Sequence, residues 1–454
     1  MTENRLLIDT YIDWVEGEGL PIYEAFGFNL LDLEVRPWDR IGANGAAVHV
    51  SGRGDYLNVF LVELSPGDST DPLRYLYEEV VYVLQGHGST TIEDSSGMRH
   101  SFEWGPKSLF AIPLNVKHRH FNTSGTEVAR LATVTNLPMM MKLFRDSDFI
   151  FANPYDFDHL IGDASYFEGK GDFIANRPGR HMWETNFVPD LSNFELKEMP
   201  ARGAGGSNIV FALAQGTMHA HMSEMPVGTY KKAHRHGPDF HIFPVSGHSY
   251  SLFLFEGDKD LNRIDWQHGS IYAPEDMMLH QHFNTSPEPV RYLAVAFGGL
   301  RFPFSEEKRR IIMGLDLDLR KGGTQIEYED QDTRKNCPIL RKPLKEAKAN
   351  ESRNPNRKAC LEKFLRGADG YKRPTESQSS DSGKIGQGFR SAMGAKSSGI
   401  YEVVHGAHDD RYCNECLHYV CSENSSSQQK RKTTNAGTST GICLERWTRT
   451  HHRR

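Results

Sequence analysis

Cysteine is absent from the first 330 residues of this 454-residue chain, because all six cysteines lie between Cys337 and Cys443. A metal bound in the first part must therefore rely on nitrogen and oxygen ligands. Long apolar runs are also absent, and none reaches the roughly 20 residues that a membrane-spanning helix needs. Residues 1–19 carry acidic side chains and Trp14 where a signal peptide would be basic and then apolar. We expect a soluble, cytoplasmic protein with no membrane partner.

Basic residues are scarce before residue 330 and abundant after it. Residues 331–454 contain 24 Lys and Arg against 13 Asp and Glu, which leaves 29 basic and 46 acidic residues in the first 330. The tail is rich in Ser, Asn, Thr and Gly, a composition typical of disorder. Its Cys413-x2-Cys416-x4-Cys421 run lacks the second ligand pair of a zinc module. Its basic residues lack the interleaved aromatic residues of a nucleic-acid binder. We predict a mostly disordered basic tail and disfavour zinc and nucleic-acid binding there.

Short apolar stretches with partial period-two alternation begin at Leu57 and are separated by turn residues, a pattern typical of antiparallel sandwiches and barrels. A second series begins near Asn208 and repeats the order of the first. The repetition is sharpest where Pro113 precedes the segment 118–122 (HRHFN) and Pro274 precedes the segment 280–284 (HQHFN). Two units about 160 residues apart indicate a duplicated barrel, since solenoids repeat every 20 to 50 residues or so.

The two series predict an all-β chain of two barrels with a helical lead-in. The expected segments are a lead-in at 1–50, a first barrel at 51–140, a connection at 141–205, a second barrel at 206–300, a closing segment at 301–330 and the tail at 331–454. We expect the connection to be ordered, because its aromatic and proline content is too high for a flexible linker.

Histidines gather in the second barrel. His234 and His236 are two residues apart, so in a strand they point to the same face. His241 can return to that point after a Gly-Pro turn, and His280 can close the site from a later strand. Imidazole nitrogens suit Fe(II), Mn(II), Ni(II), Cu(II) and Zn(II). We predict one divalent metal ion held by His234, His236, His241 and His280.

These motifs resemble those of the cupin superfamily. The resemblance rests on the pair His234 and His236, on a ligand-type residue before Gly247, and on the later series Gly269, Pro274, His280 and Asn284. Two copies make the chain similar to bicupins. The resemblance implies two cupin-type β-barrels (jelly rolls, or double-stranded β-helices), one metal per competent barrel and a homo-oligomer. Cupins usually have Glu where this chain has His241, which puts a Glu-dependent mechanism in doubt. The layout is also distantly similar to gentisate-type ring-cleaving dioxygenases.

The first barrel matches the cupin pattern less well. Aligned on Glu79 and Gly86, residues 71–75 offer no imidazole where the paired histidines are expected. Glu79, His118 and His120 remain as a weak two- or three-ligand set. We favour a degenerate, structural first barrel.

Three further residues of the second barrel are candidates. Tyr230 and Lys232 share the strand face of His234, so they are predicted to face the substrate, with Lys232 holding a carboxylate. A solvent position for Lys232 at the barrel mouth is an equal alternative. His282 is interpreted as a hydrogen-bonding neighbour of the ligands.

The histidine set favours an Fe(II) dioxygenase acting on a small, carboxylate-bearing, possibly aromatic substrate, with open metal positions for O2 and substrate. The alternatives are a non-oxidative isomerase or lyase that uses the ion as a Lewis acid, and a non-catalytic binding or storage protein.

Overall fold

The computed structural model describes residues 8–177, 180–237, 239–255, 258, 261–298, 318–321 and 323–327, all within one compact unit. The predicted tail at 331–454, with its cysteines, lies outside these residues. Among the described residues, no helix is both long and apolar enough to cross a membrane.

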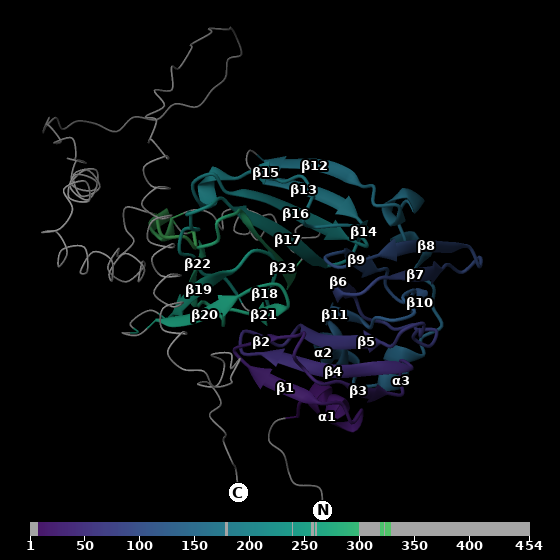
Figure 1. Cartoon of the computed structure of the whole chain (residues 1–454). Coiled ribbons are helices and arrows are strands. Elements are labelled where there is room, and N and C mark those ends of the chain that lie inside the picture. Colours follow the sequence, from purple (N-terminus) through teal and green to yellow (C-terminus); the bar gives the residue numbers. More distant parts are fainter. Residues whose placement is uncertain are drawn as a thin grey trace, which may run out of the picture. The chain divides into compact units, whose positions relative to one another are not determined.

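Strands dominate the described residues (Figure 1). The first barrel (barrel 1) contains β1 (Ile22–Ala25), β3 (Arg36–Trp38), β4 (Ala43–Val50), β5 (Asn58–Leu64), β6 (Glu79–Gln85), β7 (Gly88–Glu93), β8 (Arg99–Trp104), β9 (Leu109–Ile112), β10 (Lys117–Asn122), β11 (Ala129–Thr135) and β14 (Phe187–Val188). The second barrel (barrel 2) contains β2 (Gly27–Asn29), β12 (Asp172–Arg177), β13 (Arg180–Thr185), β15 (Lys197–Glu198), β16 (Ser207–Leu213), β17 (Met218–Met225), β18 (His241–Ser246), β19 (Ser249–Leu254), β20 (Asn262–Trp266), β21 (Ser270–Tyr272), β22 (Leu279–Asn284) and β23 (Val290–Phe297).

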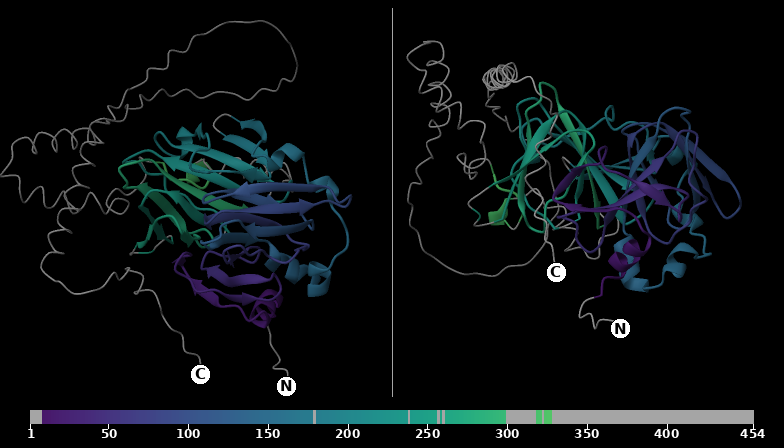
Figure 2. Two further views of the ribbon diagram at one scale, coloured as in Figure 1. Left: turned by 45° about the vertical axis from the view of Figure 1, so that its right-hand side comes forward. Right: turned by 60° about the horizontal axis from the view of Figure 1, so that its bottom comes forward.

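The helices are short. They are α1 (Thr10–Gly17), α2 (Leu137–Phe144), α3 (Ser147–Phe151) and the 3-10 turns η1 (Asp158–Leu160), η2 (Ala164–Phe167), η3 (Pro200–Arg202) and η4 (Leu319–Lys321). Asp9 caps the start of α1 by accepting from the amides of Tyr11 and Ile12. The three α-helices lie side by side next to the strands of barrel 1 (Figure 2).

Each barrel pairs a large sheet with a three-stranded sheet. The order β4-β5-β11-β6-β9 in barrel 1 is repeated as β16-β17-β23-β18-β21 in barrel 2. The small sheets, β10-β7-β8 and β22-β19-β20, also correspond. The duplication predicted from the sequence is confirmed, and with it the all-β, double-barrel fold class.

The two repeats exchange one strand each. β2 of the first repeat pairs with β21 of barrel 2, and β14 of the second repeat pairs with β9 of barrel 1. The large sheet of barrel 1 also includes β4, so it begins before residue 51, the boundary expected from the sequence.

Three apolar cores follow from this arrangement. One core lies inside each barrel, and a third packs the two large sheets against each other. In β6, Val81 and Val83 face the interior of barrel 1, whereas Val80, Tyr82 and Leu84 face the core between the barrels. Because both faces are buried, the strand is a continuous apolar run without alternation. Each fully buried aliphatic side chain contributes roughly 1.5–3 kcal/mol by leaving water.

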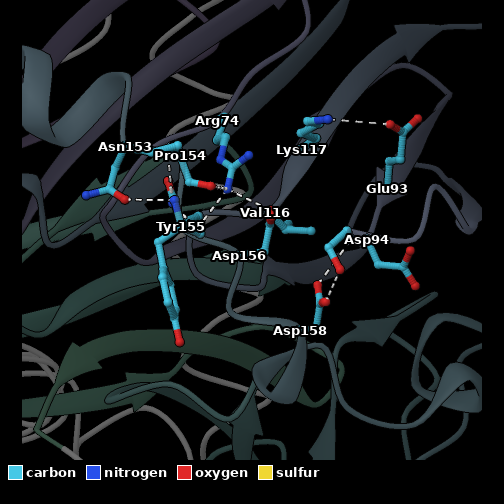
Figure 3. A network of polar contacts seen from close by, with 12 residues as sticks. Arg74, Glu93, Asp94, Val116, Lys117, Asn153, Pro154, Tyr155, Asp156 and Asp158 are labelled. Carbon is cyan, nitrogen blue, oxygen red and sulfur yellow. Dashed lines mark hydrogen bonds and ion pairs between the residues drawn. The ribbon is translucent and has the colours of Figure 1, made fainter.

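The connection between the barrels is ordered over its described residues. Figure 3 shows how the Arg74 guanidinium donates to the carbonyl oxygens of Pro154 and Tyr155, at 2.9 and 2.8 Å, and to a carboxylate oxygen of Asp156 at 2.6 Å. The connection is thereby held against the segment of barrel 1 that precedes β6.

Candidate metal centre in the second barrel

His234, His236 and His280 come together in barrel 2. One ring nitrogen from each lies within 4.8 Å of those of the other two. His234 and His280 lie opposite each other on neighbouring segments, and each donates its backbone amide to the other's carbonyl oxygen, at 3.0 and 2.8 Å. His236 follows on the same face as His234, as expected for alternate residues of an extended chain.

The orientation of the three rings fits a metal ion. In each ring Nδ1 lies 2.8–2.9 Å from a main-chain carbonyl oxygen, that of Lys232, Gly237 and Met278 respectively. A carbonyl oxygen only accepts, so Nδ1 carries the hydrogen and Nε2 keeps its lone pair for a metal. Nε2 of His280 is buried and has no hydrogen-bond partner. A buried acceptor without a partner is the arrangement that a bound cation satisfies.

Burial keeps these rings in the form that binds metal. It lowers the pKa of His236 to about 4 and the pKa values of His234 and His280 well below the ordinary value. The nearby positive charge of Arg202 lowers all three pKa values further. The imidazoles are therefore neutral at physiological pH and need lose no proton to bind a cation.

His282 is a hydrogen-bonded neighbour rather than a member of this group. Its Nδ1 lies 2.8 Å from the Ser251 hydroxyl, which also accepts a 2.9 Å hydrogen bond from the indole of Trp266. Barrel 1 has the same arrangement, with Trp104 donating to Thr90 at 2.9 Å and His120 Nδ1 lying 2.8 Å from Thr90. The Trp–hydroxyl–His arrangement thus belongs to the shared barrel scaffold.

The structure does not bring His241 into the group, so the expected four-histidine set is corrected to three. Ile242, the next residue, faces the interior of barrel 2, and Phe243 faces the core between the barrels. By alternation His241 shares the face of Phe243 and points away from the other histidines. Arg53 of barrel 1 contributes to the lowering of its pKa to about 3, although burial is the main cause.

Phe240 stands at the position that His241 was expected to fill. It precedes Gly247 by seven residues, as Glu79 precedes Gly86 in barrel 1. Its ring centroid lies 4.0 Å from that of His236. Counting back from the two glycines, at 161 residues apart, would have identified Phe240 from the sequence.

A bulge reverses the predicted roles of Lys231 and Lys232. Tyr230 pairs with Phe283 and His234 pairs with His280, so four residue steps oppose three. Lys231 is therefore the lysine that turns inward, where its ammonium donates to Ser223 at 2.7 Å and to Tyr292 at 2.6 Å. Lys232 forms an ion pair with Glu327 instead.

Tyr230, the other residue predicted to face the substrate, is 37% exposed. Its ring stacks on Phe283 with centroids 5.5 Å apart. The residue therefore lies at the wall of barrel 2, away from the three histidine rings.

A described stretch of the segment expected to close barrel 2 supports the ligands from outside. Arg235 donates its amide to the carbonyl of Thr324 at 2.9 Å, and Ile326 donates its amide to that of Ala233 at 2.8 Å. Residues 324–326 thus form a short additional strand against the ligand-bearing segment.

Barrel 1 places different residues at the same positions. Leu73 exchanges backbone hydrogen bonds with His118 as His234 does with His280, at 2.8 and 3.0 Å. Leu73 and Tyr75 thus replace the paired histidines. Glu79, His118 and His120 still lie within 4.8 Å of one another.

The hydroxyl of Tyr75 occupies the donor atoms of this first-barrel group. It donates to the Glu79 carboxylate and lies 2.9 Å from Nε2 of His118. Burial raises the pKa of Glu79 to about 7 and lowers that of His118 to about 4. Barrel 1 therefore already satisfies with hydrogen bonds the atoms that barrel 2 leaves for a cation.

Two barrels of one strand order, each with cupin-type ligand positions, define the class of this protein as a bicupin. Residues 38–160 match the auxin-binding protein family. Over 141 residues the chain is 30% identical to the auxin-binding proteins T85 and T92 of Nicotiana tabacum, which covers 29% of this chain and 71% of each relative. The chain belongs to the auxin-binding protein family, within the cupin superfamily.

Solved structures of similar fold include two oxalate decarboxylases. That of Lactobacillus farciminis, in complex with formate, is 16% identical, with a TM-score of 0.41 over 65% of this chain and 95% of that chain. That of Bacillus subtilis, with Mn(II) centres, is 16% identical, with a TM-score of 0.39 over 64% of this chain and 85% of that chain.

Proposed function

We propose that barrel 2 is the active site of a metal-dependent enzyme, with His234, His236 and His280 holding one divalent cation. The observation that supports this most directly is the convergence of three rings whose Nδ1 atoms are fixed by main-chain carbonyls and whose Nε2 atoms remain for a ligand. When bound, the ion supplies open coordination positions for substrate and, if redox-active, for O2.

The ligand set favours an anionic substrate. Three neutral imidazoles leave the full charge of a divalent cation uncompensated, whereas a carboxylate ligand at Phe240 would remove one unit. The Arg202 guanidinium adds positive potential to the same histidines. A small carboxylate-bearing substrate meets this field with the opposite charge.

The reaction we propose first is oxidation by O2 with Fe(II) as the cation, as the histidine set suggests. Phe240, Phe253 and Tyr272 line the interior of barrel 2 near the ligands and exclude water from the substrate. The alternative is a non-oxidative isomerase or lyase at the same site, with Mn(II), Ni(II), Cu(II) or Zn(II) as other candidate cations.

Metal analysis of anaerobically purified full chain tests the site. We expect one metal ion per chain in the wild type and none in the His234→Ala/His236→Ala variant. His118→Ala, at the position of barrel 1 that corresponds to His280, is the matched control and keeps the metal. A wild-type chain without stoichiometric metal contradicts the proposal.

Oxygen consumption separates the reaction classes. Substrate-dependent O2 uptake by the iron-loaded protein, screened over phenolic and keto acids, supports the dioxygenase. Turnover of a carboxylic acid without O2 uptake supports the isomerase or lyase. Ligand binding unchanged in the His234→Ala/His236→Ala variant, without turnover, supports a binding protein; the relatives T85 and T92 are named for binding auxin. A homo-oligomer stays a prediction, which mass photometry of the full chain checks.

A further inference from the structure

A small cavity lies inside barrel 2, on the side of Lys231. It is lined by Arg202, Ser207, Asn208, Met225, Thr229 and Lys231, among others. Its open space is about 10 Å³, which is room for one water-sized group. The cavity thus combines two cationic side chains with hydroxyl and amide groups in a space too small for a ring.

Lys231 is fixed at this cavity by a buried polar network. It is 7% exposed, and its ammonium donates to the hydroxyls of Ser223 and Tyr292. Asn208, on the neighbouring strand, donates to the same Ser223 hydroxyl at 3.0 Å. These contacts hold the ammonium in one place, so little ordering is needed when an anion binds.

Barrel 1 provides an internal comparison. Thr70 donates its amide to His120 as Lys231 does to His282, both at 2.9 Å, so the two residues are equivalent. Likewise Val62 pairs with Leu131 in barrel 1 where Ser223 pairs with Tyr292 in barrel 2. Barrel 2 has thus acquired a lysine and two hydroxyls together where barrel 1 is mostly apolar.

The matching cavity of barrel 1 has the opposite charge. It lies at the corresponding end of the barrel and is lined by Asp39, Glu63 and Asp68. Since the scaffolds are the same, the basic lining of the cavity in barrel 2 is not a requirement of the fold.

The network around Lys231 reaches the candidate metal centre through His282. The His282 ring lies 4.8 Å from that of Tyr292 and 5.5 Å from that of His280, between centroids. Arg202 lowers the pKa of both His280 and His282, which places its charge close to the two layers.

We propose that Lys231 and Arg202 form an oxyanion subsite that binds the second carboxylate of a substrate whose first anionic group binds at the His234, His236 and His280 centre. This inference rests on the proposed function and narrows its substrate to small dianions, dicarboxylates above all. The size of the cavity selects a single carboxylate oxygen in place of a water molecule, and Lys231 supplies a charge-assisted hydrogen bond.

A homologous series of ligands tests the subsite on the metal-loaded full chain. The probes are oxalate, malonate, succinate and glutarate, each compared by calorimetry with the monocarboxylate of equal carbon number. We expect at least one dicarboxylate to bind about tenfold or more tightly than its partner, as one charge-assisted hydrogen bond provides. Lys231→Met removes this preference and Lys231→Arg partly restores it, whereas the matched control Lys232→Met, which breaks only the Glu327 ion pair, keeps it.

The second arm separates this subsite from the metal centre. Inorganic phosphate is titrated into chelator-treated protein, where Arg202→Gln and Lys231→Met each weaken binding about tenfold while far-UV circular dichroism shows that both variants fold. Phosphate binding that depends on Lys231 in a protein that takes up no metal supports the subsite and overturns only the proposed function. Equal affinity for dicarboxylates and monocarboxylates, or a preference that survives in Lys231→Met, overturns the subsite.

Discussion

Phe240 packs against His236 with ring centroids 4.0 Å apart, at the position where barrel 1 has Glu79. The contact fixes one ligand ring by packing, without adding a ligand. It also leaves the candidate centre without a carboxylate of its own, which sets both its charge and its preference for anions.

Phe240→Glu is expected to add a fourth ligand. The carboxylate should lower the metal dissociation constant by about tenfold or more, on the order of one charge-assisted interaction. By removing one unit of positive charge, it should also weaken the binding of anionic ligands. Competition with a fluorescent chelator measures the first effect, and titration with oxalate the second. Phe240→Gln, which has no charge, is the control; equal effects of Glu and Gln would contradict the charge argument.

Leu73→His/Tyr75→His is expected to give barrel 1 a second metal site. The double change restores the paired histidines opposite His118 and removes the hydroxyl that occupies Glu79 and His118. Metal analysis should rise from one to two ions per chain. Leu73→His alone leaves Tyr75 in place and is expected to stay at one. A double variant that folds and still binds one ion would show that Tyr75 is not what excludes metal.

Glu79→Gln should stabilise the protein at neutral pH. Burial raises the folded pKa of Glu79 from 4.5 to about 7, so its stabilising contribution is complete below pH 4.5 and is lost as the pH rises through 7. The unfolding free energy of the variant, relative to wild type, is expected to increase by about 3 kcal/mol over that interval. Urea unfolding at pH 4.5, 6 and 8 measures it, and a difference that does not change with pH would oppose this reasoning.

His241→Leu should make the protein more resistant to acid. Both ring nitrogens of His241 are buried without a hydrogen-bond partner, and burial lowers its pKa to about 3. The unfolded state takes up a proton below pH 6.5 and the folded state does not, so the wild type loses stability as the pH falls. At pH 5 the variant should gain about 2 kcal/mol relative to its difference at pH 7.

The same variant also tests the correction of the ligand set. His241→Leu is expected to keep its metal ion, because His241 lies outside the group, whereas His280→Ala loses it. Loss of metal in a folded His241→Leu protein would restore the four-histidine site.

Much of the fold was predictable because it depends on local pattern. The strands around Leu57 and Asn208 have runs of apolar residues between turns, and the pair His234 and His236 predicts a shared face wherever the backbone is extended. The strand exchange of β2 and β14 was not predictable, since it depends on which sheet edge is near in the folded chain.

Two errors at the site have different physical origins. His241 was selected one residue too late, and alternation turns one such step into the opposite face of the sheet. Lys232 was chosen over Lys231 because strict alternation was assumed. The bulge between Tyr230 and His234 comes from pairing with Phe283 and His280, which are about 50 residues further along, so no local pattern shows it.

The Trp–hydroxyl–His arrangement is complete in both barrels, with Trp104, Thr90 and His120 in one and Trp266, Ser251 and His282 in the other. Barrel 1 maintains it with Leu73 and Tyr75 in place of the paired histidines. The geometry of the binding strands is therefore set before any ion arrives. A newly made chain can complete its folding first and acquire its ion later, so the supply of metal in the cell would control how much of the protein is active, and not how much of it survives.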